Sequence, residues 1–546
     1  MNHRIIVTGA FDITQFDPIE VNVWGHLLAA IAEEMGATLE RTAFSPNIKD
    51  RLDHSCAIFD SDGQLLAQAA HIPVHLGAMP LMMRALLTTL TWRPGDMWLC
   101  NAPNFGGTHL PDITLIAPIY HELPKTKSPI PSAFDGIQPI GFVASRAHHA
   151  DIGGISPGSL PLSTEIFQEG LILPPVRLVR DGELQREILD LVCANSRTGE
   201  ERNGDLQAQI AANATGARRF GALVQRYGLD KFRAAANDTL DYSAEMVKQT
   251  LMEIPAGRYH AIDWLELETA ATNARIEVTI TVGASGSIHF DFNGTSSQTH
   301  TPLNATEAIT RSACLYVVRC MVNEDIPTNE GCFRPVTVNA PSGTLLNASH
   351  GAAVAAGNVE TSQRIVDVIL QALASAMPQS IPADSQGTMN NLTIGGWDPV
   401  HNRRFAYYET ICGGAGASPH GPGFSAIQCH MTNTRNTPVE TLESHYPLRV
   451  LEYSIREDCP NNGLHQGGAG VVRRIELLAP CTVSVLSERR SLAPHGLAGG
   501  ASGACGKNIW HTAYAAAETM PARFTRNGQC GDIIEIRTPG GGGWGR

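Results

Sequence analysis

The chain has 546 residues, of which 43% are hydrophobic and 17% are charged, so it has enough apolar material for two or three folded cores. Its formal net charge of −13, from 53 acidic and 40 basic residues, argues against a nucleic-acid partner. The sequence has no uninterrupted apolar stretch of about 18 residues, which argues against a membrane-spanning helix.

The N-terminal residues and the cysteines indicate the cellular compartment. Residues 1–14 lack the apolar segment of a secretory signal. The 12 cysteines include no Cys-x-x-Cys pair, so we expect neither a zinc finger nor a disulfide framework. We therefore expect a cytoplasmic protein whose cysteines are mostly reduced and buried.

The first predicted helix spans about residues 21–42. Its apolar residues repeat at helical spacing: Val23, Leu27, Ile31, Met35 and Leu39. Two short strands, residues 55–60 and 64–69, follow on either side of a turn at residues 61–63. Asp53 precedes this hairpin and could add an oxygen ligand to a nearby metal site.

Two histidines, His71 and His75, stand four residues apart, a spacing that on a regular helix would place both on one face. Pro73 lies between them and disfavours a regular helix. A structural role is the preferred interpretation, and metal ligation stays open. The next helix is predicted at about residues 79–90 and is mainly core.

The strongest chemical signal lies in two glycine-flanked segments, residues 104–113 and 146–154. Together they hold five candidate ligands or catalytic groups: His109, Asp112, His148, His149 and Asp151. A lone His-x-x-Asp pair is commonly a surface hydrogen bond, but the second cluster strengthens the interpretation as a metal site. Imidazole and carboxylate together suit Zn, Mn or Fe, whereas an all-oxygen site suits Ca or Mg.

Each of the two segments borders an apolar run that predicts a buried strand, residues 113–118 and 139–144. Two neighbouring strand ends would present the ligands at one edge of a sheet. Because adjacent residues on an extended chain face opposite sides, one of His148 and His149 should point away. That histidine could support a ligand, shuttle a proton or simply be packed.

Two further segments near these motifs are predicted to be loops. Residues 125–138 are rich in proline and predict a surface insertion between the two clusters. Residues 158–175 are punctuated by proline and glycine and carry Glu165. Such a loop could form a wall or lid of a site, although an ordinary solvated loop is the simpler interpretation.

The middle of the chain changes from helical to strand periodicity. Residues 182–254 are predicted to be mainly helical. Two alternating strands, residues 276–282 and 288–292, form a hairpin, and helices follow at residues 305–322 and 360–377.

Two glycine-rich turns, residues 387–391 and 413–417, could cradle an anion with backbone N–H groups. Neither matches a P-loop, and no G-x-G-x-x-G motif follows a strand and opens a helix. The sequence therefore shows no nucleotide-binding fingerprint.

The C-terminal part predicts three short strands, residues 449–456, 471–478 and 482–487. The chain closes on a glycine run, residues 540–543, followed by Trp544. An apolar tryptophan at the end of such a run indicates that the tail docks on the protein.

These signals predict a mixed α/β (α+β), multi-domain fold with intertwined mixed and antiparallel sheets. We expect an N-terminal metal-site region at residues 1–180 and a helical region at 181–260. A second α/β region is expected at residues 261–440, and a β-rich, glycine-rich region at 441–546.

The chain resembles the hydantoinase B/oxoprolinase family over about residues 16–545. This family includes N-methylhydantoinase B subunits, the C-terminal half of 5-oxoprolinase, and subunits of acetone and acetophenone carboxylases. The resemblance rests on many motifs in order: residues 47–49, 51–53, 71–77, 106–112, 147–154, 168–170, 357–362, 386–391, 431–438, 487–490 and 538–543.

The resemblance implies a divalent metal site and an ATPase partner. The resemblance implies that His109, Asp112 and His148 hold a Zn or Mn ion, as the residues at these positions do in members of the family. It also implies Asp53 as a further metal ligand. An A-type ATPase subunit would bind ATP with Mg and phosphorylate the amide oxygen of the substrate. A hetero-oligomer is therefore implied.

The implied activity is that of a B-type subunit of an ATP-dependent cyclic amidohydrolase acting on 5-oxoproline or a hydantoin. His149, Asp151 or Glu165 could relay a proton in this reaction. The alternatives are a subunit of a ketone carboxylase and a non-catalytic assembly subunit.

The chain departs from the family pattern at residues 458–468 and in the insertion at residues 125–138. The first departure puts in doubt a loop that would face a phosphate or the partner subunit. The second should only add surface.

Overall fold

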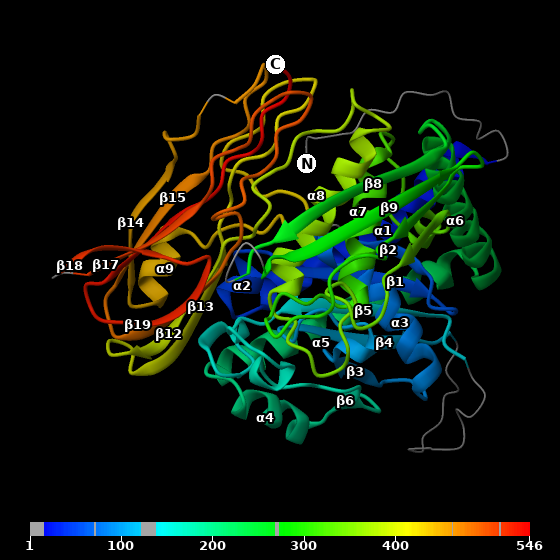
Figure 1. Cartoon of the computed structure of the whole chain (residues 1–546). Helices are drawn as coiled ribbons and strands as arrows, with labels where there is room; N and C mark the ends of the chain where they lie inside the picture. Colours follow the sequence, from blue (N-terminus) through cyan, green and yellow to red (C-terminus); the bar gives the residue numbers. More distant parts are fainter. Residues whose placement is uncertain (1–15, 70–71, 122–137, 268–271, 461, 513–514) are drawn as a thin grey trace.

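The computed structural model describes residues 16–69, 72–121, 138–267, 272–460, 462–512 and 515–546 (Figure 1). Three sequence-based expectations lie outside the described residues: the N-terminal residues 1–14, His71, and residues 125–137 of the predicted insertion.

The two glycine-flanked segments, residues 104–113 and 146–154, adjoin one seven-stranded sheet with the strand order β2-β1-β5-β4-β3-β6-β7. Its strands are β1 (His54–Asp60), β2 (Leu65–Gln68), β3 (Met97–Cys100), β4 (Asp112–Ile119), β5 (Gly141–His148), β6 (Val176–Arg180) and β7 (Glu183–Leu184). All neighbouring pairs are antiparallel. The central strands β4 and β5 are buried along their whole length.

Successive residues of a strand point to opposite faces of the sheet, so these apolar strands expose apolar side chains on both faces. Helices cover each of the two faces. The helices α1 (Pro18–Thr42), α5 (Gly199–Tyr227) and α6 (Leu229–Met252) pack on the face that includes Ile58. The helix α3 (Ala78–Thr89) packs on the face that includes Phe59. Two shorter helices are α2 (Pro46–Lys49) and α4 (Arg186–Ala194).

The predicted first helix is confirmed, but its buried face differs by one residue at the start. Trp24 and Leu28 are buried in the core, whereas Val23 is 48% exposed. A spacing of four residues drifts around a helix of 3.6 residues per turn, so Val23 falls off the face that Ile31 and Met35 define.

A second layer holds a four-stranded sheet with the order β11-β10-β9-β8. Its strands are β8 (Gly257–Leu265), β9 (Ala274–Gly283), β10 (Ser287–Asp291) and β11 (Val336–Asn339). The helices α7 (Glu307–Met321) and α8 (Ser362–Ala374) pack against it in the largest apolar core (Figure 1). A π-helical turn, Gly357–Thr361, precedes α8.

The C-terminal part is a pair of antiparallel sheets that enclose one apolar core. One sheet has the order β13-β12-β16-β19, and the other has the order β14-β15-β20-β17-β18. Their strands are β12 (Asn391–Asp398), β13 (Arg403–Thr410), β14 (Leu448–Ile455), β15 (Val471–Leu477), β16 (Cys481–Leu486), β17 (Lys507–Thr512), β18 (Ala515–Met520), β19 (Arg523–Gly528) and β20 (Ile533–Arg537). The helix α9 (Val439–His445) precedes β14.

The terminal glycine run is docked, as the sequence predicts. Residues 538–545 are buried, and Trp544 is 9% exposed. The glycines allow backbones to touch, because a Cβ atom on Gly541 would lie only 2.0 Å from the carbonyl oxygen of Ala415.

The mixed α/β, multi-domain fold class is confirmed by these layers. The sequence patterns do not predict β3, β6 to β8, β11 to β13 or β17 to β20. Most of these strands are short or carry polar residues on an exposed face, whereas β12 and β13 mix buried polar residues with apolar ones. The region boundaries at residues 180, 260 and 440 stay a prediction.

All 12 cysteines are free, and six are buried. Among the described residues, no helix combines the length and apolar composition needed to cross a bilayer.

Candidate functional site

The ends of β4 and β5 bring the predicted ligands together. Asp112 is the first residue of β4, and His148 is the last residue of β5. The two strands are antiparallel, and their register places Asp112 directly opposite His148. His109 lies in the turn just before Asp112. The structure therefore places His109, Asp112 and His148 together where these two strands end, as the sequence predicts.

Three side-chain atoms converge on one point. His109 Nε2 lies 3.1 Å from Asp112 Oδ1 and 3.1 Å from His148 Nδ1, and His148 Nδ1 lies 3.2 Å from Asp112 Oδ1. Ligand atoms bound tetrahedrally to one Zn ion at about 2.0–2.1 Å are about 3.3 Å apart. The separations therefore fit a shared ion, and the three residues form a group that could hold one.

Neighbouring groups orient these ligands. His109 Nδ1 lies 3.2 Å from the carbonyl oxygen of Ala355, so the other ring nitrogen is left to face the cluster. Thr108 donates a 2.6 Å hydrogen bond to Asp112 Oδ2, and Asn358 Nδ2 lies 3.3 Å from the same oxygen. Asp112 is therefore held in one orientation.

His75 belongs to this network through Asp112. Its Nε2 atom lies 3.3 Å from Asp112 Oδ2, and its Nδ1 atom lies 2.9 Å from Ser55 Oγ. It is not in the group of three mutually close ligand atoms. Of its two interpretations, the geometry favours support of a ligand over ligation.

Burial and mutual contact shift the pKa values of Asp112 and the neighbouring histidines. Burial alone would raise the pKa of Asp112, but the imidazoles of His109 and His75 hold it well below its usual range. Burial opposes the charged form of His109, but Asp112 outweighs it and raises the pKa of His109. Burial lowers the pKa values of His148 and His75. The lowered pKa of His148 keeps its imidazole neutral beside the ionised Asp112, a pair suited to a cation, and a bound cation would displace any proton on His109.

The cluster opens into a small buried cavity. The three candidate ligands, several apolar residues and several hydroxyl-bearing residues line it: Asp53, Ile72, Val74, His75, His109, Asp112, His148, Asn358, Val359, Met389, Tyr408, Thr410, Met431, Thr432 and Thr434. The volume open to a water-sized sphere is about 20 Å³. That space holds about one water molecule or one ion.

Asp53 lines this cavity, but it is not in the group of three mutually close ligand atoms. Burial raises the pKa of Asp53, and His148 opposes that rise. Its ligand role stays a prediction.

The three residues expected to relay a proton lie outside the cavity lining. His149 Nε2 lies 3.0 Å from Gln209 Oε1 on α5, so it is the histidine that points away. Burial, together with the charge of Arg202, lowers the pKa of His149. Asp151 accepts hydrogen bonds from three backbone N–H groups and from Arg197. Glu165 is exposed to solvent. The catalytic roles of these three residues stay a prediction.

Residues that the local sequence pattern does not single out complete the site. Asn358 lies 246 residues from Asp112 in the chain. The Tyr408 ring stacks on the His148 ring at a centroid distance of 4.7 Å. Asn358 belongs to an ordinary helix start and Tyr408 to an ordinary strand pattern. Only the family motif at residues 357–362 points to Asn358, and no motif points to Tyr408.

A second group of possible ligands is explained without an ion. Asp263, Asp384 and His495 also bring three ligand atoms together. Arg489 Nη2 lies 3.1 Å from Asp263 Oδ2, 3.0 Å from Asp384 Oδ2 and 2.8 Å from Asp367 Oδ2. The guanidinium already supplies the positive charge that these carboxylates need.

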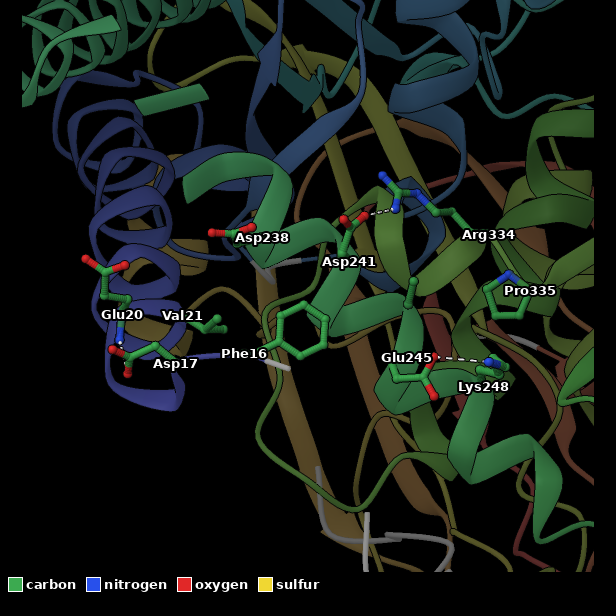
Figure 2. Close-up of a pocket in the computed structure, with 11 residues that line it drawn as sticks. Phe16, Asp17, Glu20, Val21, Asp238, Asp241, Glu245, Lys248, Arg334 and Pro335 are labelled. Atoms are coloured by element: carbon green, nitrogen blue, oxygen red, sulfur yellow. Dashed lines mark hydrogen bonds and ion pairs between the residues drawn. The ribbon is translucent and has the colours of Figure 1, made fainter. Parts of the chain in front are cut away.

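A larger open pocket of about 560 Å³ lies between α1 and α6 (Figure 2). Its carboxylates Asp241 and Glu245 pair with Arg334 and Lys248, as the dashed lines show. None of the three converging ligands lines this pocket. The smaller cavity is therefore the candidate site.

Nearly the whole chain is similar to known proteins. A family model described as hydantoinase B/oxoprolinase matches residues 17–546. The chain is 41% identical to 5-oxoprolinase 1 of Arabidopsis thaliana over 97% of its own length, but it spans only 42% of that protein. It is 30% identical to a putative D-/L-hydantoinase B subunit of Pseudomonas sp. (strain NS671), covering 98% of this chain and 91% of that one. The ATP-dependent caprolactamase from Pseudomonas jessenii shares the fold with a TM-score of 0.85 at 25% identity, covering 97% and 92% of the two chains.

Proposed function

This chain belongs to the hydantoinase B/oxoprolinase family, and on that premise we propose that it is the B-type subunit of an ATP-dependent cyclic amidohydrolase. The substrate would be 5-oxoproline or a hydantoin. The observation that carries the proposal is the meeting of His109, Asp112 and His148 in a buried cavity.

We propose that these three residues hold a Zn or Mn ion and that Asp53 adds a further oxygen ligand. Such an ion, once bound, lowers the pKa of a coordinated water and offsets negative charge at the attacked carbon. Thr108, His75 and Asn358 fix the Asp112 carboxylate, and Ala355 fixes the His109 ring. These contacts would keep the ligands in place as charge develops.

The division of labour with an ATPase follows from the chemistry of amides. An amide carbon is a poor electrophile, and phosphorylation of the amide oxygen makes it open to attack. Water adds to the ring carbon, the carbon–nitrogen bond breaks as nitrogen takes a proton, and a second water releases phosphate. Since the sequence carries no nucleotide fingerprint, we propose that an A-type ATPase partner binds ATP with Mg. The names of the Pseudomonas relatives, a hydantoinase B subunit and an ATP-dependent caprolactamase, support this division.

Proton transfer to the ring nitrogen is assigned to His149, Asp151 or Glu165. His149 is the first choice because it is adjacent to His148, and its Nδ1 atom is buried without a hydrogen-bond partner. Since it does not line the cavity, a relay through it requires a bridging water or a rotation of the ring.

The cavity also indicates that substrate entry needs a conformational change. Small-molecule pockets commonly measure about 300 Å³ or more. A cavity of about 20 Å³ admits an ion and water but not a five-membered ring. The walls must therefore separate before the substrate binds.

The proposal is tested by co-expressing the chain with its A-type ATPase and measuring ADP formation and ring opening with 5-oxoproline and with hydantoin. We expect coupled turnover in the wild type and a loss of at least about 100-fold in His109→Ala, because the variant lacks one ligand. Full activity of His109→Ala would favour an assembly role. Ketone-dependent consumption of bicarbonate, without ring opening, would favour the carboxylase alternative.

A further inference from the structure

The guanidinium of Arg51 is wholly buried and makes no ion-pair contact with a carboxylate in the part of the chain that the structure describes, although its charge acts on Asp53 and opposes the rise in the pKa of that residue. Its hydrogen bonds all go to neutral acceptors. They are the carbonyl oxygens of Arg435 and Tyr408, Oδ1 of Asn47, and the hydroxyls of Thr410 and Thr434. Buried charges are normally paired, because removing an unpaired ion from water is unfavourable. A fixed positive charge therefore stands behind the two threonines without an opposing carboxylate in contact.

The threonine hydroxyls have a defined direction of hydrogen bonding. Thr410 Oγ1 accepts from Arg51 Nη2 at 3.1 Å and from Gln428 Nε2 at 3.2 Å, which fills both of its lone pairs. Its hydrogen is then donated to Thr434 Oγ1, which lies 2.6 Å away. Thr434 in turn donates to Thr432 Oγ1 at 3.3 Å.

The last hydroxyl of this chain has a hydrogen to spare. Thr432 Oγ1 accepts from the Thr434 hydroxyl and from the Thr434 backbone N–H at 3.4 Å. Its own hydrogen is therefore left for another acceptor. Each donor polarises the next, so the Arg51 charge strengthens the Thr432 hydroxyl as a donor.

This donor faces the candidate site. Thr410, Thr432 and Thr434 all line the cavity that also contains the His109, Asp112 and His148 side chains. The proposed ring-opening reaction makes no use of them. A chain of buried donors that starts at a cation and ends in a cavity suits an anionic oxygen.

We propose that Thr432, backed by Thr434, Thr410 and Arg51, forms a subsite for an oxyanion of the substrate. The oxyanion is either the carboxylate of an amino-acid-derived lactam or the phosphoryl group of the activated amide. The identity of this ligand rests on the proposed function, whereas the hydrogen-bond chain does not. The carboxylates of Asp53 and Asp112 in the same cavity would oppose an anion, and a cation held beside them would offset their charge.

The test is calorimetric titration of the full, Zn-loaded chain with three probes at fixed ionic strength. The probes are 5-oxoproline, 2-pyrrolidinone, which has the same ring without a carboxylate, and inorganic phosphate. The variants are Thr432→Val and Thr434→Val, each of which removes one hydroxyl with little change in shape. The matched control is Thr437→Val, since Thr437 is buried nearby and its hydroxyl has no hydrogen-bond partner.

We expect Thr432→Val and Thr434→Val to weaken anion binding by about tenfold or more, as for loss of a hydrogen bond to a charged group. Binding of 2-pyrrolidinone should not change, and Thr437→Val should match the wild type. A selective loss for 5-oxoproline identifies the carboxylate as the ligand, and a selective loss for phosphate identifies the phosphoryl group.

The proposal is overturned if both variants bind both anions as Thr437→Val does. It is also overturned if neither anion binds the Zn-loaded wild type. Since the titration requires no turnover, failure of the subsite is distinguishable from failure of the ring-opening function, which is read from ATP-dependent product formation.

Discussion

Replacement of Glu360 by glutamine should stabilise the protein at neutral pH, and the stabilisation should grow as the pH rises. Glu360 is wholly buried in the π-helical turn before α8. It accepts hydrogen bonds from the Met389 N–H at 3.2 Å and from Asn391 Nδ2 at 2.8 Å. Burial raises the pKa of Glu360 from 4.5 to about 8, and hydrogen bonds to the carboxylate only partly oppose it.

The sign and size of the effect follow from proton linkage. Between pH 4.5 and 8 the unfolded chain has lost this proton while the folded protein keeps it, so stability falls as the pH rises. Each pH unit in that window costs about 1.4 kcal/mol, which gives about 3 kcal/mol by pH 7. Glutamine has no proton to lose. For a chain of 546 residues that unfolds in one transition, this corresponds to about 3 °C in Tm.

Scanning calorimetry of the wild type and Glu360→Gln at pH 5, 6, 7 and 8 measures this difference. The Tm advantage of Glu360→Gln should be below about 1 °C at pH 5 and should reach about 3 °C at pH 7. The exposed Glu440 provides the control, and Glu440→Gln should follow the wild type at every pH. Parallel pH profiles of wild type and Glu360→Gln would show that folding does not raise the pKa of Glu360.

Three further predictions concern the site and the packing. Asn358→Leu removes the amide beside Asp112 and should weaken Zn binding by about 10- to 100-fold, measured in competition with a chromophoric chelator. Unchanged Zn affinity would contradict the role of Asn358 in orienting Asp112. Arg489→Met leaves three aspartates without their guanidinium partner and should lower the free energy of unfolding by about 3–5 kcal/mol. A calorimetric Tm within about 1 °C of the wild type would contradict this role of Arg489. Gly541→Ala places a Cβ 2.0 Å from the Ala415 carbonyl and should reduce Tm and soluble yield, whereas Gly221→Ala, which meets nothing within 4 Å, should preserve both. Equal Tm values for the two alanine variants would contradict the packing argument.

The core of the site could be predicted because its signals are local in sequence. His109 and Asp112 share one turn, and an apolar strand precedes His148. Antiparallel pairing of two adjacent strands then brings Asp112 and His148 together. The alternation of side chains along a strand also predicts that one of His148 and His149 points away, and the contact with α5 shows that it is His149.

The rest of the site could not be predicted because it depends on tertiary contacts. Asn358 meets Asp112 across 246 residues, and Arg51 meets Thr434 across 383 residues. No hydrophobic periodicity marks Arg51, Asn358 or Thr434, and only the family motifs at residues 51–53, 357–362 and 431–438 include them. The strands β12 and β13 also escape prediction, because residues 391–410 mix buried polar groups with apolar ones.

The glycine-rich C-terminus shows a different limit of sequence patterns. Apolar content is the usual signal for burial, yet residues 540–543 are buried because glycine lets backbones touch. Trp544 is the one residue of this segment whose type predicts docking. The close approach of Gly541 to Ala415 has no counterpart in hydrophobic periodicity.

Elemental analysis of the purified chain after exhaustive dialysis tests most directly whether His109, Asp112 and His148 hold one metal ion. We predict near-stoichiometric Zn or Mn in the wild type and in His149→Gln, whose altered side chain points toward α5. The His109→Ala/His148→Ala double variant, with unchanged circular dichroism, should lose the metal. Retention of the metal by this folded double variant, or no binding by the wild type after reconstitution, would contradict the account.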